Sequence, residues 1–166
     1  TIRVANVNDP PTFTSTVDSI ENATQDVPYS YTVTATDVDG GDSVTLTGTT
    51  IPSWLSFTDN GDNSGVLSGT PGNDDVGDHS VEITATDQNN GINTQSFTIR
   101  VANVNDPPTF TSTVDESVTN ATEDVAYSYT VIASDVDGED SVRLEATTKP
   151  SWLSFTDNGN NTGVLS

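Results

Sequence analysis

Acidic side chains gather at a few points of the chain instead of spreading evenly along it. Asp37 and Asp39 lie in ATDVDGGD, directly after a strand-like run, and Asp135 and Asp137 lie in ASDVDGED after a matching run. When two Asp residues one position apart end a strand, both carboxylates can reach the same side of the turn. Carboxylates this close repel one another unless a positive charge neutralises them. The chemistry that this spacing indicates is therefore the binding of a hard cation.

Oxygen-bearing side chains recur at comparable places elsewhere. Asp87 ends the run TATDQNNG. The segment NVNDPP occurs twice and supplies Asn8, Asp9, Asn103, Asn105 and Asp106. Ca²⁺ takes about six to eight oxygen ligands from carboxylates, amides and backbone carbonyls, so calcium is the cation that these residues favour. An EF-hand is excluded, because neither DVDGGD nor DNGDNSG has the glycine and closing glutamate of that loop. The alternative, a solvated or salt-adapted acidic surface without an ion, stays open.

Composition excludes several other functions. Twenty-five Asp and Glu face four Lys and Arg, for a net charge of -21, so a basic face for nucleic acid cannot form. The absence of Cys rules out disulfides, cysteine zinc sites and thiol enzymes. One His offers little for a nucleophilic triad, and the chain is predicted not to be an enzyme. No run approaches the ~20 apolar residues of a membrane span.

The elements that must position these acids read as strands. Tyr29, Tyr31, Val33 and Ala35 alternate with Ser and Thr, which is the period of a half-buried strand. Further alternating runs surround Val44 and Leu46, Leu55 and Phe57, Val81 to Ala85, Phe97 to Val101, and Tyr127 to Ala133. Turn-forming segments such as TDNGDNSG separate them. Since no window shows a 3.6-residue period, the predicted fold class is all-β.

A long internal repeat sets the domain organisation. Residues 1–18 recur unchanged at 98–115, and 36 of the 47 residues in 22–68 are identical in 120–166. This period fits one β-sandwich of ~100 residues. We predict the last strand and linker of a preceding repeat at 1–8, repeat one at 9–106, and a truncated repeat two at 107–166. The second repeat would lack two or three strands, so it would be unstable alone or completed by another chain, for example in a strand-swapped dimer.

The motifs resemble those of cadherins. NVNDPP is similar to the cadherin linker, ATDVDG and ASDVDG to its Asp-X-Asp segment, and TATDQNNG to a later acidic segment. The string IPSWLSFTDN, GVLSGTP, DVGDHSVEITATD resembles the dystroglycan-type cadherin-like module, also described as an Ig-like domain of bacterial surface proteins. The resemblance covers the whole chain. It implies tandem seven-stranded Greek-key sandwiches with calcium at the joints, in large secreted or surface proteins.

The resemblance also implies a set of calcium ligands. Between the two repeats they would be Asn103, Asn105, Asp106, Asp135 and Asp137, and at the first joint Asn8, Asp9, Asp37, Asp39 and Asp87. The early cadherin Glu corresponds to Glu123 in the second copy but to Gln25 in the first, and the linker begins with Asn6 or Asn103 instead of Asp. Because these sites carry fewer formal charges than the cadherin sites, we predict about one ion per joint, with a dissociation constant of ~10⁻⁴–10⁻³ M.

These observations predict a calcium-stiffened spacer repeat of an extracellular cell-surface adhesin, whose partners are calcium and neighbouring repeats. The alternative is a carbohydrate-binding module of a secreted polysaccharide-acting protein, and homophilic binding between arrays is a third possibility. Trp54 separates the first two, because tryptophan can stack on a sugar or anchor a core. Its neighbours Leu55 and Phe57 favour the core.

Overall fold

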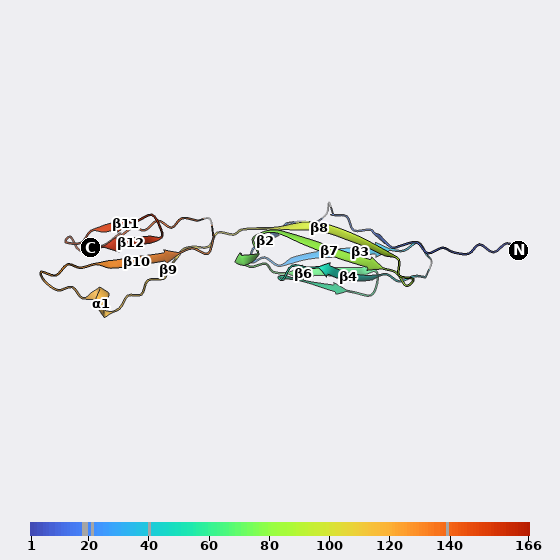
Figure 1. The fold of residues 1–166 in the computed structure, drawn as a ribbon, viewed down its shortest axis with the longest axis horizontal. Coiled ribbons are helices and arrows are strands. Elements are labelled where there is room, and N and C mark those ends of the chain that lie inside the picture. The colour runs from blue at the N-terminus through green and yellow to red at the C-terminus, as the bar shows by residue number, and fades with distance from the viewer. Residues whose placement is uncertain (18–19, 21, 40, 139) are drawn as a thin grey trace. The chain divides into compact units, whose positions relative to one another are not determined.

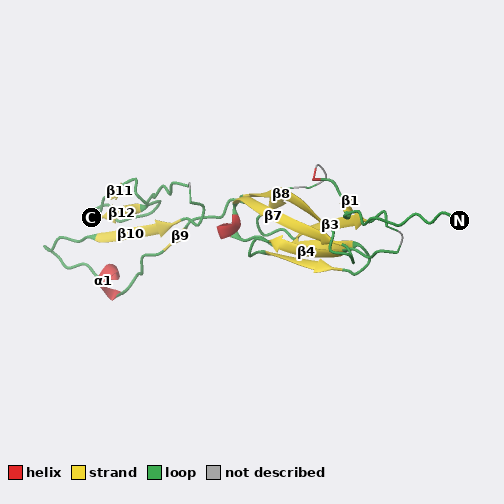
Figure 2. Cartoon of the chain, turned by 45° about the vertical axis from the view of Figure 1, so that its right-hand side comes forward, coloured by secondary structure: helices red, strands yellow, loops and turns green. Residues whose placement is uncertain are grey.

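The computed structural model describes residues 1–17, 20, 22–39, 41–138 and 140–166. The chain divides into two compact units, Thr1–Val104 and Asn105–Ser166 (Figure 1), and we call them unit 1 and unit 2. Strands make up nearly all of the regular structure of both (Figure 2), which confirms the predicted all-β class. Within the described residues, none of the helices has the length and apolar character that crossing a membrane requires.

Unit 1 consists of two four-stranded sheets. The first has the order β1 (Thr12–Phe13), β3 (Tyr29–Thr36), β6 (Ser64–Gly69), β5 (Leu55–Asp59). The second has the order β2 (Ala23–Thr24), β8 (Ile92–Ala102), β7 (Gly77–Thr86), β4 (Thr45–Thr50). A short 3-10 turn, η2 (Asn73–Asp75), precedes β7. The expected number of seven strands is not confirmed in the described part of unit 1. Its first strand is divided, since β1 pairs with β3 while β2 pairs in parallel with β8.

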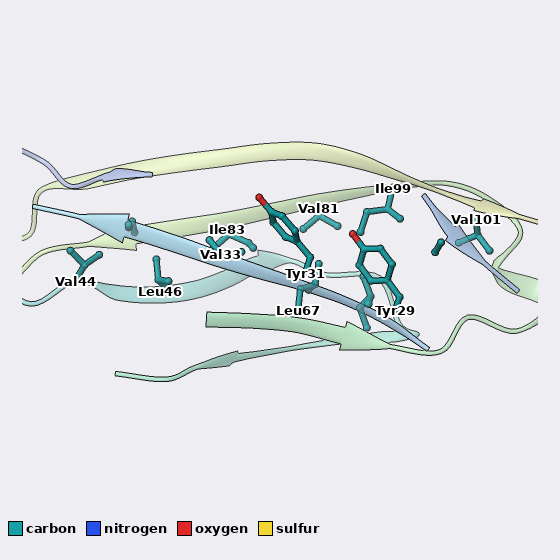
Figure 3. Close-up of a cluster of buried hydrophobic side chains, with 14 residues drawn as sticks. Tyr29, Tyr31, Val33, Val44, Leu46, Leu67, Val81, Ile83, Ile99 and Val101 are labelled. Carbon is teal, nitrogen blue, oxygen red and sulfur yellow. The ribbon is translucent and has the colours of Figure 1, made fainter. Parts of the chain in front are cut away.

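The inner faces of the two sheets form the core of unit 1 (Figure 3). Val33 and Leu67 from the first sheet and Ile83 and Ile99 from the second are completely buried. Alternation places them there, because every second residue of a strand points to the same face. Ser and Thr take most of the intervening, outward positions. The strand ends that carry the acids are therefore fixed by a rigid apolar interior.

Trp54 belongs to this core. It is half-buried, packs against the apolar cluster and makes edge-to-face ring contacts with Tyr29 and His79, each with centroids 5.9 Å apart. Aromatic pairs prefer this arrangement. Its indole N–H is buried as well, so the packing of Trp54 is that of a core anchor.

The turn between β5 and β6 ties the sandwich together at the end where the acids lie. Asp59 Oδ2 accepts a hydrogen bond from the Leu46 amide at 3.1 Å, and Asn63 Oδ1 accepts one from the Val44 amide at 2.9 Å. Asn63 adopts a φ of 64°, a left-handed conformation that Asn tolerates better than most residues. Because Val44 directly follows the acidic loop, these two side chains fix where that loop ends.

Unit 2 contains one sheet, with the order β11 (Phe155–Asp157), β12 (Thr162–Leu165), β10 (Tyr129–Ser134), β9 (Thr109–Phe110), and a short helix α1 (Glu116–Thr119). It reproduces the first sheet of unit 1. In the described residues of unit 2, no strand takes the place of β7 and β8. Phe110 is consequently 72% exposed and Trp152 61% exposed, whereas their counterparts Phe13 and Trp54 are half-buried.

Candidate metal centre

The acids after β3 form a compact cluster in unit 1. One carboxylate oxygen from each of Asp37, Asp39 and Asp42 lies within 4.8 Å of the other two. The loop is closed by its own hydrogen bonds, because Asp37 Oδ1 accepts from the Asp39 amide at 2.8 Å and the Asp39 carbonyl accepts from the Asp42 amide at 3.1 Å. Sequence reasoning proposed Asp37 and Asp39 but missed Asp42, the third acid of DVDGGD.

The N-terminal linker residues of unit 1 lie against this cluster. The Asn6 side-chain amide donates to Asp39 Oδ1 at 2.7 Å, and the Asp9 backbone amide donates to Asp39 Oδ2 at 2.8 Å. Asp39 therefore fastens the linker to the loop through both of its oxygens. Asp9 itself is exposed, so its carboxylate contributes negative charge near the cluster. Asn6 was noticed only as a departure from the cadherin linker, yet it contacts the cluster directly.

Asp87 stands at the end of β7 and is only 6% exposed. The Asn8 amide donates to its Oδ2 at 2.8 Å, while the backbone amides of Gly91 and Asn89 donate to its Oδ1 at 2.7 and 2.8 Å. A Cβ at position 91 would collide with the Asp87 carboxylate, so a residue larger than glycine would have to displace that carboxylate. The Asn89 side chain completes the site by donating to Asn8 Oδ1 and Asp42 Oδ2, each at 2.9 Å.

The hydrogen bond from Asn8 is the main reason that the pKa of Asp87 lies below its ordinary value of 3.8, and the Gly91 and Asn89 amides act in the same direction. Burial opposes the shift by raising the pKa. A pKa that folding lowers means that the charged carboxylate stabilises the fold above pH 3.8. This contribution is lost as the pH falls below 3.8 through the lowered pKa.

We therefore expect Asn8→Ala, studied in EDTA, to raise the pKa of Asp87 and to move the acid unfolding of unit 1 to higher pH. Carboxyl-carbon NMR titration measures the pKa, and circular dichroism against pH measures the unfolding. Asn6→Ala is the matched control, because it removes an amide that contacts Asp39 instead of Asp87. An unchanged Asp87 titration in Asn8→Ala would show that this hydrogen bond does not form in solution.

One oxygen in the cluster lacks a partner. Asp37 Oδ2 is buried and accepts no hydrogen bond from the described residues. Burying a carboxylate oxygen without compensation is costly, and a buried charge is normally paired or bound to a metal. The other side-chain atoms that the cluster brings together are carboxylate oxygens of Asp39 and Asp42, which suit a hard cation such as Ca²⁺. The residues present therefore fit the ion that the sequence predicts.

The same arrangement recurs in unit 2. Asp135, Asp137 and Asp140 bring one oxygen each within 4.8 Å of one another. Asp135 Oδ1 accepts from the Asp137 amide at 2.9 Å, and the Asp106 amide donates to Asp137 Oδ2 at 2.7 Å. Asp137 is 6% exposed, and its Oδ1 is buried without a partner among the described residues. Asp140 is the acid that sequence reasoning missed here.

The remaining predicted ligands lie outside these two three-acid clusters. Asn105 is exposed and donates its side-chain amide to the Asp106 carbonyl at 3.0 Å. Asn103 is exposed at the end of unit 1, just after β8. Glu123 is exposed and lines a hollow beside Trp152 in unit 2. The roles of these three residues stay predictions.

Gln25, which replaces the early cadherin Glu in the first repeat, is 2% exposed. Its Oε1 accepts from the Val104 amide at 3.3 Å, and its backbone amide donates to the Ala102 carbonyl at 3.0 Å. A neutral side chain thus fastens the last residues of unit 1 without needing an ion. The number of ions at each joint stays a prediction.

A family model described as Putative Ig domain matches residues 10–102, which is more than half of the chain. Comparison with curated protein sequences gives no match. Among solved structures, PcdhgB3 EC1-4 is similar over 98% of this chain and 42% of its own length, with a TM-score of 0.67 and 18% identity. Protocadherin Gamma B7 extracellular cadherin domains 1-4 match over 97% and 41%, with a TM-score of 0.61 and 18% identity. At this identity both show the fold alone.

A third similar structure is the endo-fucoidan hydrolase MfFcnA4 from glycoside hydrolase family 107. It is 25% identical, with a TM-score of 0.53, and the match covers 94% of this chain but 24% of the hydrolase. The chain thus spans about a quarter of the hydrolase and about two fifths of the protocadherin structures.

Proposed function

The chain belongs to the Putative Ig domain family, and on that premise we propose that it is a calcium-binding, calcium-stiffened spacer repeat of an extracellular cell-surface adhesin. The observation that carries the proposal is the pair of buried, unpartnered carboxylate oxygens, Asp37 Oδ2 and Asp137 Oδ1. Each lies in a cluster of three acids at the same place in its unit. The two oxygens belong to different positions of the motif, the first Asp of DVDGGD and the second Asp of DVDGED. In both units, however, a buried carboxylate oxygen without a partner among the described residues lies among three acids, which favours a cation there.

Calcium suits the clusters better than other cations. Zinc and other transition metals prefer Cys and His, whereas every side-chain ligand atom in these clusters is an oxygen. Mg²⁺ demands near-ideal octahedral geometry, while Ca²⁺ accepts irregular sets of carboxylates, amides and carbonyls. In unit 1, Asn6 and Asn8 donate N–H groups to Asp39 and Asp87. If these amides turned over, they would present oxygen ligands to the ion.

Stiffening would follow from where the linker lies. Residues 6–9 of unit 1 already contact the acids after β3 and β7. An ion that gathers those acids and the linker oxygens into one coordination shell would hold the linker against the sandwich. Without the ion, repulsion between the acids would be opposed, among the described residues, by the hydrogen bonds that amide groups donate to the Asp39 and Asp87 carboxylates. The protocadherin-like fold and the acidic, cysteine-free composition agree with such a module outside the cell.

We propose that the chain is not catalytic. The likeness to the fucoidan hydrolase covers only 24% of that protein, and the two three-acid clusters lie in the loops that follow β3 and β10. We accordingly propose that the part of the hydrolase that this chain resembles is an accessory domain of that enzyme.

Carbohydrate binding is the second candidate function, because a polysaccharide hydrolase is among the similar structures. Trp54 argues against it, since it packs in the core. Trp152 of unit 2, at 61% exposed, is the aromatic residue that a sugar could reach. Pull-down on insoluble polysaccharides, with Trp152→Ala as the comparison, tests this. Retention that depends on Trp152 would favour the carbohydrate reading.

Strand exchange remains our proposal for the apolar face of unit 2, where Phe110 and Trp152 are exposed. Strands equivalent to β7 and β8, from a neighbouring repeat or a second copy, would cover it. Sedimentation of the chain over a concentration series tests whether copies associate, and a monomer at all concentrations would exclude the dimer.

Thermal and urea unfolding in EDTA and in 10 mM calcium test the main proposal. With a dissociation constant of ~10⁻⁴–10⁻³ M, calcium at ~10 mM should stabilise each occupied unit by about 1.4–2.7 kcal/mol. Isothermal titration calorimetry gives the stoichiometry, and X-ray scattering of an array of complete repeats measures stiffness. Magnesium at the same concentration is the control for general screening of charge. Equal stabilisation by both ions, or none by either, would mean that the acids are only solvated.

A further inference from the structure

Three Asn-Gly sequences occur in the described part of the chain, and each ends in a glycine whose backbone amide is held by a carboxylate. Gly61 N donates to Asp59 Oδ1 at 3.0 Å, Gly159 N to Asp157 Oδ1 at 3.0 Å, and Gly91 N to Asp87 Oδ1 at 2.7 Å. Asn-Gly is the sequence most open to self-modification, because glycine has no side chain to hinder attack by its own amide nitrogen.

The reaction needs two groups to be free. The glycine nitrogen loses its proton and attacks Cγ of the preceding Asn, so that an N–Cγ bond forms, the Cγ–Nδ2 bond breaks and ammonia leaves. Water then opens the resulting five-membered imide at one of its two carbonyls, and an aspartyl or isoaspartyl residue results. A hydrogen bond from the glycine N–H to a carboxylate opposes the first step, because it favours the protonated nitrogen.

Two of the three sites are restrained a second time. The Asn60 side-chain amide donates to Ser64 Oγ at 2.8 Å, and the Asn158 amide donates to Thr162 Oγ1 at 2.9 Å. Both Asn side chains are thus held toward the opposite strand of the β5–β6 or β11–β12 turn. The glycine nitrogen and the Asn side chain that must meet are each tied to a different neighbour.

Asn90 lacks the second restraint. It is exposed, has a φ of 67°, and its side-chain amide has no hydrogen-bond partner in the described part of the chain. We propose that Asn90 is the site of spontaneous deamidation in this protein, while Asn60 and Asn158 are protected by their turns. The product places a new carboxylate three residues from Asp87, and the isoaspartyl form also lengthens the backbone of that turn.

The test is incubation of the whole chain in mildly alkaline buffer with EDTA, followed by peptide mapping with mass spectrometry that distinguishes aspartyl from isoaspartyl products. Because a neutral hydrogen bond is worth roughly a two- to tenfold factor in an equilibrium, Asn90 should react at least about that much faster than Asn60 and Asn158. In concentrated urea the three rates should converge, since the fold sets the order. Equal rates in the native chain would overturn the proposal.

Ser64→Ala separates side-chain restraint from general turn rigidity. It frees the Asn60 amide and leaves Thr162 to hold Asn158 in the same molecule, so Asn158 is the internal control. The Asn60 rate should rise roughly two- to tenfold while the Asn158 rate stays constant. If the Asn60 rate does not change, the second restraint has no protective effect and the explanation for Asn90 is wrong. Neither experiment depends on whether the clusters bind calcium.

Discussion

Leu67→Ala is expected to lower the free energy of unfolding of unit 1 by about 2–5 kcal/mol, the cost of removing a buried leucine and leaving a cavity. Leu67 is completely buried between the two sheets. Urea unfolding followed by tryptophan fluorescence measures the effect. Trp152→Phe provides the background, because it leaves Trp54 as the reporter of unit 1 and replaces a side chain that is 61% exposed.

Leu165 is the matched control, since it occupies the same position in β12 that Leu67 occupies in β6. It is only half-buried, because unit 2 has no second sheet over it among the described residues. Leu165→Ala should therefore cost clearly less, measured on unit 2 with Trp152 as reporter and Trp54→Phe as background. Equal costs would mean that the apolar face of unit 2 is covered in solution, as strand exchange would do.

The period of two residues was enough to predict the sheets. Tyr29 to Ala35 and Val81 to Ala85 alternate so regularly that their inner residues form the observed core. The divided first strand was not predictable, because β1 and β2 are two residues long each. Two residues are too few for a period to appear, and only the pairing with β3 and β8 identifies them.

The pattern of strands also predicted most of the acids in the two clusters, but it left out one acid in each. Asp37 and Asp39 follow β3 of unit 1, and Asp135 and Asp137 follow β10 of unit 2, so each sheet places its own pair just beyond the end of one strand. Asp42 and Asp140 join them only because a turn closed by the Asp39 and Asp137 carbonyls folds the loop back. Sequence spacing does not reveal such a turn. The third acid of DVDGGD and DVDGED was nevertheless a visible signal.

The cadherin resemblance grouped the linker residues Asn8 and Asp9 with the acids, but the hydrogen bonds that join the linker to these acids could not be predicted from the sequence. Asn6 and Asn8 are 33 and 79 residues away from the Asp39 and Asp87 carboxylates that they contact. The sequence predicts Asp59 and Asn63 only as turn residues. Their side chains also accept hydrogen bonds from the Leu46 and Val44 amides, which depends on β4 and the residue before it passing beside that turn. Long-range hydrogen bonds of polar side chains leave no period in a sequence, whereas apolar faces do.

Asp37→Asn is expected to have opposite effects with and without calcium. In EDTA, it removes one of three carboxylates within 4.8 Å of one another. Since two like charges ~4 Å apart repel by about 1 kcal/mol even in water, unit 1 should become more stable by about that amount. In 10 mM calcium it removes a formal charge from the proposed ligand set, so the calcium-dependent gain of about 1.4–2.7 kcal/mol should largely disappear. Urea unfolding in both buffers, with Trp54 as reporter, measures the two effects.

Asp74→Asn is the control, because it removes the same charge from an exposed residue of η2 that lies outside both three-acid clusters. It should change the stability of unit 1 little in either buffer and leave the calcium gain intact. The reversal of sign at Asp37 distinguishes an ion site from a solvated acidic loop, since solvated acids would respond alike at both positions. If Asp37→Asn destabilises unit 1 in EDTA and leaves the calcium gain unchanged, then hydrogen bonding alone maintains the loop and the spacer is not stiffened by calcium at this cluster.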